Sequence, residues 1–292
     1  MQLEPGLVAM PAWTFVATAH AVLQAGLTPW MLDVDLDSAM LDPEAVRSQL
    51  AAAPGPVRAV IPVAPHGRMV DLPAWAAFRD ATGLPVIVDA AAAFDATTEA
   101  QLPMVVSLHA TKAMGIGEGG FLATRDEGLA ARVRALSVFG FKGSREARFP
   151  STNSKLSEYA AAVGLAGLDA WPATRRRFGL VAQRLRMALA LTPQVGFQPG
   201  WGSQWVSSVC VVGLPDGAAD WVEDALADEG VDTRRWWGDG CHRNPAFAGL
   251  PRADLPNTER LARQTLGLPF MIDMTEDELF RIADGLRRAL AH

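Results

Sequence analysis

The first half of the chain alternates short apolar runs with segments whose apolar residues recur at helical spacing. The apolar runs predict strands at residues 6–11, 28–34, 57–63 and 85–89. The periodic segments predict helices at residues 13–25, 42–53 and 73–82, with start and stop residues at their ends. Strands that alternate with helical connections indicate a mostly parallel sheet flanked by helices, so we expect an α/β fold.

The pattern changes in the second half. Strands are predicted at residues 104–109 and 120–124, followed by helices at 127–139, 155–170 and 172–191 around a polar loop at 140–152. Further strands are predicted at residues 206–212 and 231–237, and further helices at 218–229, 258–266 and 275–291. We expect a large α/β domain at residues 1–175 and a smaller α+β domain at 176–292, divided between residues 172 and 195.

Polar residues stand where several of the predicted strands end. Asp89 closes the run PVIVD, Lys112 follows the strand at 104–109, and His66 follows another strand. Ligands of open parallel sheets bind beyond the carboxyl ends of the strands. We therefore expect a ligand site at this edge, with Asp89 and Lys112 in it.

Lys112 lies in a glycine-rich turn between two strands. A lysine that is desolvated there becomes a nucleophilic amine, which a Schiff base with a carbonyl compound or with pyridoxal phosphate requires. An ordinary surface lysine is the alternative. The turn Gly115-Ile-Gly117-Glu-Gly119 lacks the spacing of a dinucleotide-binding loop and leads into a strand instead of a helix, which argues against that interpretation.

Asp89, Ser107 and Phe15 each have a functional and a structural interpretation. Asp89 is followed by alanines and has no partner nearby in the sequence, so it either caps a turn or meets a cation such as a pyridinium nitrogen. Ser107 is either an ordinary strand residue or a hydroxyl donor to a phosphate. Phe15 by itself indicates a core residue.

Composition and charge narrow the classes of function. The chain has 292 residues, 50 % of them hydrophobic, and a net charge of −6 without a basic block, which argues against nucleic-acid binding. Cys210 and Cys241 cannot form a disulfide framework, a signal peptide is lacking, and no stretch approaches ~18 consecutive apolar residues. We expect a cytoplasmic protein without a membrane span.

Competing chemistries have weak support in the sequence. The histidines show no metal-binding motif and do not pair with the cysteines, so we expect no metal site. Neither a Gly-x-Ser-x-Gly elbow nor a P-loop occurs.

Two segments of the sequence are specific enough to indicate a protein family: SLHATKAMGIGEGGFLAT, around the lysine, and LPNTERLA. Weaker ones are PAWTFVATAHAVLQAG, DVDLDSAMLDPEAV, VIPVAPHGRMVDLPAW, PVIVDAAAAFDA, NSKLSEYAAAVGLAGLD and VDTRRWWGDGCHRNPAF. Together, and in this order through nearly the whole chain, they resemble the DegT/DnrJ/EryC1/StrS family of pyridoxal-phosphate aminotransferases. The resemblance implies the type I fold of the PLP-dependent transferases, like that of aspartate aminotransferase.

The resemblance also implies roles for individual residues around the cofactor, pyridoxal 5′-phosphate. Lys112 corresponds to the Schiff-base lysine, which carries the proton between Cα and C4′. Asp89 would pair with the pyridine nitrogen, Phe15 would stack on the ring and Ser107 would bind the phosphate.

The resemblance extends to partners and substrates. Asn153 would reach the phosphate of the neighbouring subunit's cofactor, which implies a homodimer with shared active sites. Trp236, Trp237 and His242 lie where the family handles its sugar nucleotide. The implied reaction moves an amino group from an amino acid, typically glutamate, to a keto-sugar, mostly nucleotide-linked. Relatives with histidine in place of the lysine are dehydratases, so Lys112 favours the aminotransferase.

Two departures from the family pattern have consequences. Ala92 stands where the family usually has Gln or His near the 3′-oxygen of the cofactor, so the electronics of the ring are expected to differ. The family's N-terminal portion, with a Gly-Thr turn that holds the phosphate, is absent from this sequence, which predicts an uncovered apolar surface of sheet and helix. Three explanations of the absent portion are open. The start of the sequence is misplaced, a partner completes the chain, or the chain is a remnant that no longer catalyses. The alternative function is therefore that of a truncated, non-catalytic homologue, a weak cofactor binder or an interaction scaffold.

Overall fold

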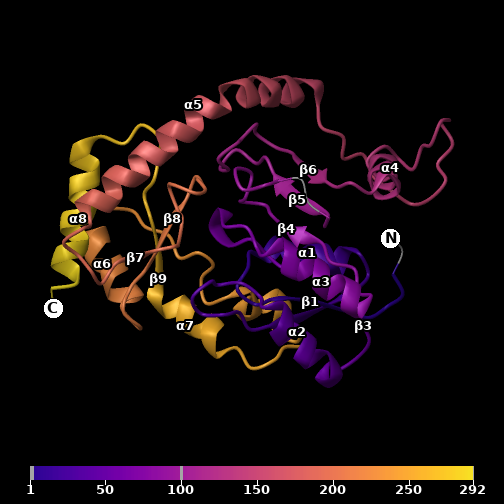
Figure 1. Ribbon diagram of the computed structural model, residues 1–292, viewed down its shortest axis with the longest axis horizontal. Helices are drawn as coiled ribbons and strands as arrows, with labels where there is room; N and C mark the ends of the chain where they lie inside the picture. Colours follow the sequence, from indigo (N-terminus) through magenta and orange to yellow (C-terminus); the bar gives the residue numbers. More distant parts are fainter. Residues whose placement is uncertain (1–2, 99–100, 292) are drawn as a thin grey trace.

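The first half of the chain is built on a sheet of mainly parallel strands (Figure 1). The computed structural model describes residues 3–98 and 101–291. The strands are β1 (Leu7–Pro11), β2 (Thr28–Leu32), β3 (Val57–Val60), β4 (Val88–Asp89), β5 (Met104–Ser107) and β6 (Gly120–Ala123). Bridges from Val60 to Val86 and from Val63 to Asp89 join β3 to the chain of β4, so the order is β2-β1-β3-β4-β5-β6. Only β6 runs antiparallel to its neighbour, which confirms the predicted α/β class.

Helices connect the parallel strands as predicted. They are α1 (Val16–Gln24), α2 (Pro43–Gln49) with the 3₁₀ turn η1 (Leu50–Ala52), and α3 (Leu72–Thr82). Asp42 accepts a hydrogen bond of 2.7 Å from the backbone of Ala45, and Asp71 accepts one of 3.0 Å from Ala74. These carboxylates satisfy backbone donors in the first turns of α2 and α3 and so define where the two helices begin.

The two helices predicted on either side of Pro172 form one helix, α5 (Glu158–Ala188). The prediction of a break was wrong, although proline removes a backbone donor and clashes with the preceding turn. The helix continues because its side chains are anchored next to the proline, where Trp171 packs edge-on against Phe94 at 4.8 Å. Figure 1 shows α5 as a single curved helix that passes from the C-terminal elements towards β6.

The rest of the chain forms a small antiparallel sheet and its helices. The sheet has the order β7 (Gly196–Phe197), β8 (Cys210–Gly213) and β9 (Thr265–Leu268). The helices of this part are α6 (Ala219–Asp228), α7 (Pro256–Gln264) and α8 (Glu276–Ala289), and the short 3₁₀ turns are η3 (Cys241–Arg243) and η4 (Pro245–Phe247). The helix α4 (Glu127–Leu136) lies apart from the small sheet, at the opposite end of the molecule (Figure 1). The predicted helices are confirmed, whereas the short strands β7 and β9 lay outside the predictions.

The strand predicted at residues 231–237 is wrong. Only Arg234 pairs with the sheet, through backbone hydrogen bonds of 2.9 and 2.8 Å with Gly267 of β9. Beyond it the indole of Trp236 lies so close to Gly267 that a Cβ there would be 2.6 Å from Trp236 Cδ1. The bulky side chain covers the strand instead of continuing the ladder, and the chain turns into the site described below.

The buried apolar side chains form two main clusters. One lies between α5, α6, α8 and the antiparallel sheet and contains Leu185, Leu226 and Leu286. The other packs the parallel sheet around Trp75 and also takes in Leu261 of α7. Since α5 crosses residue 175 without a break, the division into residues 1–175 and 176–292 stays a prediction.

A buried ion pair ties the two halves together. The side chain of Asp95, 3 % exposed, accepts a hydrogen bond of 2.8 Å from Arg175 of α5. The same carboxylate accepts a hydrogen bond of 2.9 Å from the backbone of Val206. Asp95 follows β4 by a few residues, so it fixes the segment after Val206 near the carboxyl end of that strand.

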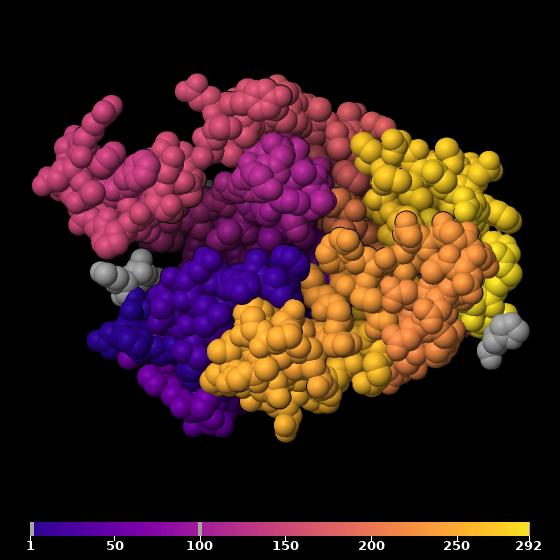
Figure 2. Space-filling model, turned by 180° about the vertical axis from the view of Figure 1, so that it is seen from behind, coloured from indigo at the N-terminus to yellow at the C-terminus, as the bar shows by residue number. Residues whose placement is uncertain are grey.

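Two surface features stand out. An apolar hollow of about 560 Å³ lies between α1 and the sheet, lined by residues such as Val8, Ala21, Ile61 and Ile87. Figure 2 shows α4 and the loop after it, in pink, projecting from the body of the molecule. Among the helices of residues 3–98 and 101–291, none combines the length and apolar character that a bilayer span needs.

Candidate active site

Lys112 lies in a loop beyond β5 whose shape depends on glycine. A backbone hydrogen bond of 2.7 Å from Ala110 to Gly117 closes the loop. Gly117 and Gly119 have φ values of 94° and 153°, a region that glycine adopts far more readily than other residues. The glycines of this turn therefore allow the lysine loop to fold back onto the end of its strand.

Burial and the charge of Asp89 act on Lys112 in opposite directions. Burial lowers the pKa of the Lys112 amine below its ordinary value, and the nearby Asp89 carboxylate raises it. Asp89 ends β4 and Lys112 follows β5, its neighbour in the sheet, so the two residues lie at the same edge of the sheet. An amine with a lowered pKa is nucleophilic over a wider range of pH.

The carboxylate of Asp89 is fixed by two donors. Thr18 of α1 donates a hydrogen bond of 2.7 Å to one oxygen, and the backbone of Ala91 donates one of 3.1 Å to the other. Thr18 is itself bonded to the buried Thr14 at 2.8 Å. The helix α1 thus sets the orientation of a carboxylate that lies far away in the sequence.

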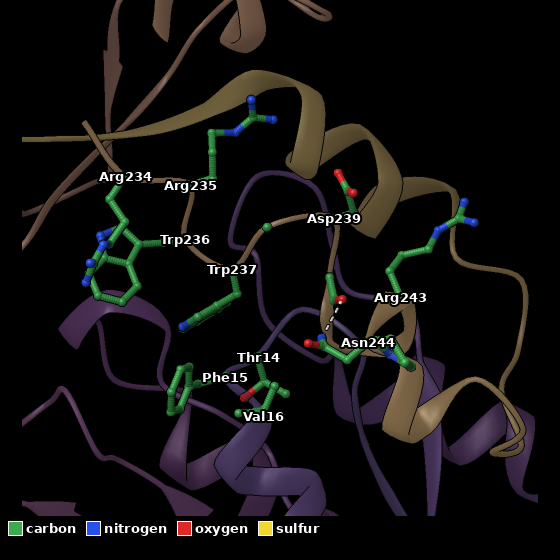
Figure 3. Close-up of a pocket in the computed structure, with 13 residues that line it drawn as sticks. Thr14, Phe15, Val16, Arg234, Arg235, Trp236, Trp237, Asp239, Arg243 and Asn244 are labelled. Carbon is green, nitrogen blue, oxygen red and sulfur yellow. Dashed lines mark hydrogen bonds between the residues drawn. The ribbon is translucent and has the colours of Figure 1, made fainter. Parts of the chain in front are cut away.

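Phe15 and Trp237 face each other across a cavity of about 440 Å³ (Figure 3). Phe15 is 54 % exposed, so the core interpretation of this residue is wrong. Trp236 and Arg234 lie on the same rim, with the guanidinium 5.2 Å from the centre of the indole. An exposed aromatic ring next to basic side chains suits a planar or anionic ligand.

His66 lies behind this cavity and was not recognised as a site residue from the sequence. Its ring is 4 % exposed and stacks on Trp237, with centres 4.6 Å apart. Burial first, and then the charge of Lys112, lower the pKa of His66 to about 3. The ring is therefore neutral and lies near the amine.

Ser107 and Asn153 take different positions. Ser107 is the last residue of β5, and its hydroxyl accepts a hydrogen bond of 3.2 Å from the backbone of His109. Asn153 is exposed in the projecting loop, where its side-chain oxygen accepts a hydrogen bond from Lys155. Ser107 is therefore placed to act in the same site as Lys112 of its own chain. Asn153 is placed where it could contact another subunit.

His242 is separated from Trp236 and Trp237, with which the sequence grouped it. It lines a second cavity of about 340 Å³, which shares Arg243 with the larger one. His242 is 3 % exposed, and neither ring nitrogen has a hydrogen-bond partner among the described residues. Burial is the main cause that lowers its pKa.

Contacts from the second half of the chain complete the site. Ser208 donates a hydrogen bond of 2.6 Å to the backbone oxygen of Thr111, the residue before Lys112. A Cβ at Gly67 would lie 3.0 Å from the backbone oxygen of Ala92 and 3.1 Å from Ser207 Cβ. The turn after β3, the chain after Asp89 and the segment before β8 therefore meet beside the lysine loop.

These side chains form a donor and acceptor set that fits one small aromatic cofactor. Asp89 provides a fixed carboxylate for a ring nitrogen, Lys112 provides the amine for a carbonyl carbon, and Phe15 provides an exposed ring for stacking. Ser107 provides a hydroxyl at a neighbouring strand end. The set matches the chemistry of pyridoxal phosphate, whose pyridine nitrogen, aldehyde and phosphate need those three kinds of partner.

The comparison with protein families decides the identity. The model of the DegT/DnrJ/EryC1/StrS aminotransferase family matches residues 3–287. The chain belongs to this family. It is a PLP-dependent aminotransferase with the type I fold of these enzymes, and pyridoxal phosphate is its cofactor.

Several relatives and solved structures are similar to this DegT/DnrJ/EryC1/StrS chain. The dTDP-3-amino-3,4,6-trideoxy-alpha-D-glucose transaminase of Streptomyces venezuelae is 30 % identical over 299 residues, which cover 96 % of this chain and 75 % of the relative. The pleiotropic regulatory protein of Geobacillus stearothermophilus is 30 % identical over 297 residues, covering 96 % and 77 %. The structure of DesI in the presence of its TDP-sugar product has a TM-score of 0.85 and 37 % identity over 97 % of this chain and 74 % of that one.

Proposed function

We propose that this aminotransferase moves an amino group from an amino acid, glutamate, to a nucleotide-linked keto-sugar. The observation that carries the proposal is the placement of Asp89 at the end of β4 and of Lys112 in the loop beyond the neighbouring strand β5, where the charge of Asp89 acts on the amine. The sugar class is supported by relatives that are named for aminosugar transamination or for a TDP-sugar product. When bound, pyridoxal phosphate supplies an electron sink that stabilises negative charge at the carbon next to the amine.

Lys112 is the proposed proton carrier. Its amine takes the proton from the α-carbon of the amino donor and returns a proton on the cofactor side of the transferred amine. Burial lowers the pKa of Lys112, which makes the amine easier to deprotonate than an ordinary surface lysine. Asp89, oriented by Thr18 and Ala91, keeps the ring nitrogen protonated through its negative charge.

The other proposed site residues bind and orient. Phe15 stacks on the ring and Ser107 donates its hydroxyl to the phosphate. The acceptor sugar enters the cavity between Phe15 and Trp237, where Arg234 and Arg243 offer positive charge to the phosphates of a sugar nucleotide. His242, which lines the adjoining cavity, lies within reach of a ligand that extends past Arg243.

A homodimer is part of the proposal. The N-terminal half of α5 exposes apolar side chains to an unusual degree: Tyr159 is 82 % exposed and Leu165 is 65 % exposed. Contiguous exposed apolar side chains of this kind mark protein interfaces. Docking of a second copy on this face brings Asn153, in the adjacent loop, towards the partner's site, which is how the two active sites become shared. The compartment proposed is the cytoplasm, in keeping with Cys210 and Cys241, which are both buried as free thiols.

The test begins with the purified protein and excess pyridoxal phosphate. We expect visible absorbance, and we expect reduction with borohydride to attach the cofactor to the peptide that contains Lys112. Lys112→Arg keeps the positive charge and should abolish the attachment, whereas Lys155→Arg should not affect it. Glutamate should then bleach the visible absorbance, and a keto-sugar nucleotide should restore it. A colourless protein, or attachment at another lysine, contradicts the proposal.

The relative named a pleiotropic regulatory protein favours a second candidate function. In it the chain is a non-catalytic homologue that binds the cofactor weakly or serves as an interaction scaffold. Its signature is cofactor attached at Lys112 with no amino transfer from glutamate or any other amino acid. Steady-state transfer to a keto-sugar nucleotide, measured as the aminated product, rules it out.

A further inference from the structure

The turn that carries His66 has features that packing alone does not explain. It is a short 3₁₀ segment, η2 (Pro65–Gly67), two residues beyond the bridge from Val63 to Asp89. His66 has a φ of 56°, in the left-handed region that residues other than glycine seldom adopt. Such backbone outliers gather at ligand sites, where the surrounding structure holds them in place.

His66 has a largely buried ring whose nitrogens are open to a partner. Its ring is 4 % exposed, no hydrogen bond joins either ring nitrogen to the part of the chain that the structure describes, and neither nitrogen is among the fully buried side-chain atoms that lack a partner. A donor that is enclosed on most sides but still reachable is available to a ligand that enters the site. One face of the ring is already used, since it stacks on Trp237 at 4.6 Å. The ring nitrogens are therefore the groups that remain for a ligand.

The strand order shows which part of the cofactor His66 meets. Strands β3 and β5 flank β4, so His66, beyond β3, and Ser107, at the end of β5, lie on opposite sides of Asp89. In pyridoxal phosphate the phosphate arm and the phenolic oxygen likewise lie on opposite sides of the line from the ring nitrogen to the aldehyde carbon. With Asp89 at the nitrogen, Lys112 at the aldehyde and Ser107 at the phosphate, the phenolic oxygen faces the side of His66.

We propose that His66 binds the cofactor directly, with one ring nitrogen donating a hydrogen bond to the phenolic oxygen of pyridoxal phosphate. The inference rests on the proposed role of Lys112 as the residue that carries the cofactor. The chain after Asp89 offers no competing side chain, because residues 90–93 are all alanine. Trp237 stacks on the imidazole with an interplanar angle of 22° and so limits its rotation, which makes Trp237 a positioning residue.

The contact has a spectroscopic consequence. A donor stabilises the ionised form of the phenolic oxygen, so the bound cofactor gives up its proton at a lower pH. The imidazole itself stays neutral across the working range because burial and the charge of Lys112 hold its pKa at about 3. Lys112 is the charged group that acts on this imidazole. Removing the donor should move the visible titration of the bound cofactor to higher pH.

The decisive variant is His66→Phe, which keeps a flat ring to stack on Trp237 and removes both nitrogens. We expect the pH midpoint of the visible absorbance to rise by about one to two units, as the loss of a hydrogen bond to a charged oxygen requires. We also expect cofactor binding, followed by quenching of tryptophan fluorescence, to weaken about ten-fold or more. His66→Gln retains a donor and should keep the midpoint within about half a unit of wild type.

His20→Phe is the matched control, since His20 is an exposed histidine of α1 whose ring also packs on an aromatic one, Phe247, at 4.9 Å. It should leave the midpoint and the affinity unchanged. His66→Ala is measured alongside in case the phenylalanine is not accommodated, and circular dichroism verifies the fold of each variant.

The outcomes separate this inference from the proposed function. If wild type attaches the cofactor at Lys112 but folded His66→Phe and His66→Ala keep its midpoint and affinity, His66 serves only for packing and the inference is overturned. If wild type takes up no cofactor at Lys112, the proposed function falls first and this inference falls with it.

Discussion

Thr18 donates a hydrogen bond of 2.7 Å to Asp89, from the first helix to the end of the fourth strand of the sheet order. The two residues are 71 positions apart in the sequence. The bond fixes one carboxylate oxygen, while the backbone of Ala91 fixes the other. The remaining lone pairs are available for the proposed contact with the ring nitrogen of the cofactor.

Removing the hydroxyl of Thr18 should weaken cofactor binding. Thr18→Val keeps the size and branching of the side chain but leaves one oxygen of Asp89 without its donor. A hydrogen bond to a charged group contributes about 1.5–3 kcal/mol, so we expect an affinity for pyridoxal phosphate that is at least about ten-fold lower. Equilibrium titration by fluorescence quenching measures it. Thr28→Val, on β2, is the control, and equal affinities for the two variants would show that Thr18 does not hold the carboxylate for the cofactor.

Neutralising Asp89 should slow the chemistry more than it weakens binding. Asp89→Asn keeps the shape of the side chain but cannot keep the ring nitrogen protonated by charge. We expect the rate of amino transfer from glutamate to fall by about 10³-fold, the size of a lost electrostatic stabilisation at a reacting centre. Single-turnover absorbance measures this half-reaction. Asp216→Asn, which removes a surface ion-pair partner of Arg263, should react at the wild-type rate.

The pH dependence of stability should reveal the buried neutral histidine. The pKa of His66 is about 3 in the folded chain and about 6.5 when unfolded, so between these values the unfolded state binds a proton that the folded state does not. Stability is therefore lost as pH falls from 7 towards 3. Between pH 7 and pH 4 wild type should lose roughly 3 kcal/mol more than His66→Phe. Urea unfolding of the cofactor-free proteins at both pH values measures this loss of stability. Equal losses in wild type and His66→Phe would contradict a buried neutral imidazole.

A charge on the exposed face of α5 should break the proposed dimer. Leu165, 65 % exposed, lies on that face, and Leu165→Glu would place a carboxylate in the interface at a cost of roughly 2 kcal/mol or more. We expect the mass from light scattering to fall to that of one chain, and activity to fall with it if the sites are shared. Phe280→Glu on α8, at a residue 62 % exposed, is the control and should leave the mass unchanged. A wild-type chain that is monomeric at all concentrations would contradict the proposal.

Much of the fold was readable from local signals. The helix start at Asp42 and the apolar runs marked the helices and strands of the first half to within a few residues, whereas the cap at Asp71 was found only in the structure. The same local rules failed at Pro172, where tertiary contacts of Trp171 outweigh the cost of the proline. They failed again at residues 231–237, where Arg234 pairs with β9 and the side chain of Trp236 then covers that strand instead of extending the ladder.

The sequence by itself determined which chemistry was available: a lysine in a glycine turn and an acid at a strand end, each recognisable because its neighbours set the local backbone. Only the tertiary structure decided which other groups join them. Thr18 and Ser208 carry no local signal, and His66 is marked in the sequence only by its position after a predicted strand. Their partners are chosen by strand order and burial, which bring together residues that the chain keeps far apart.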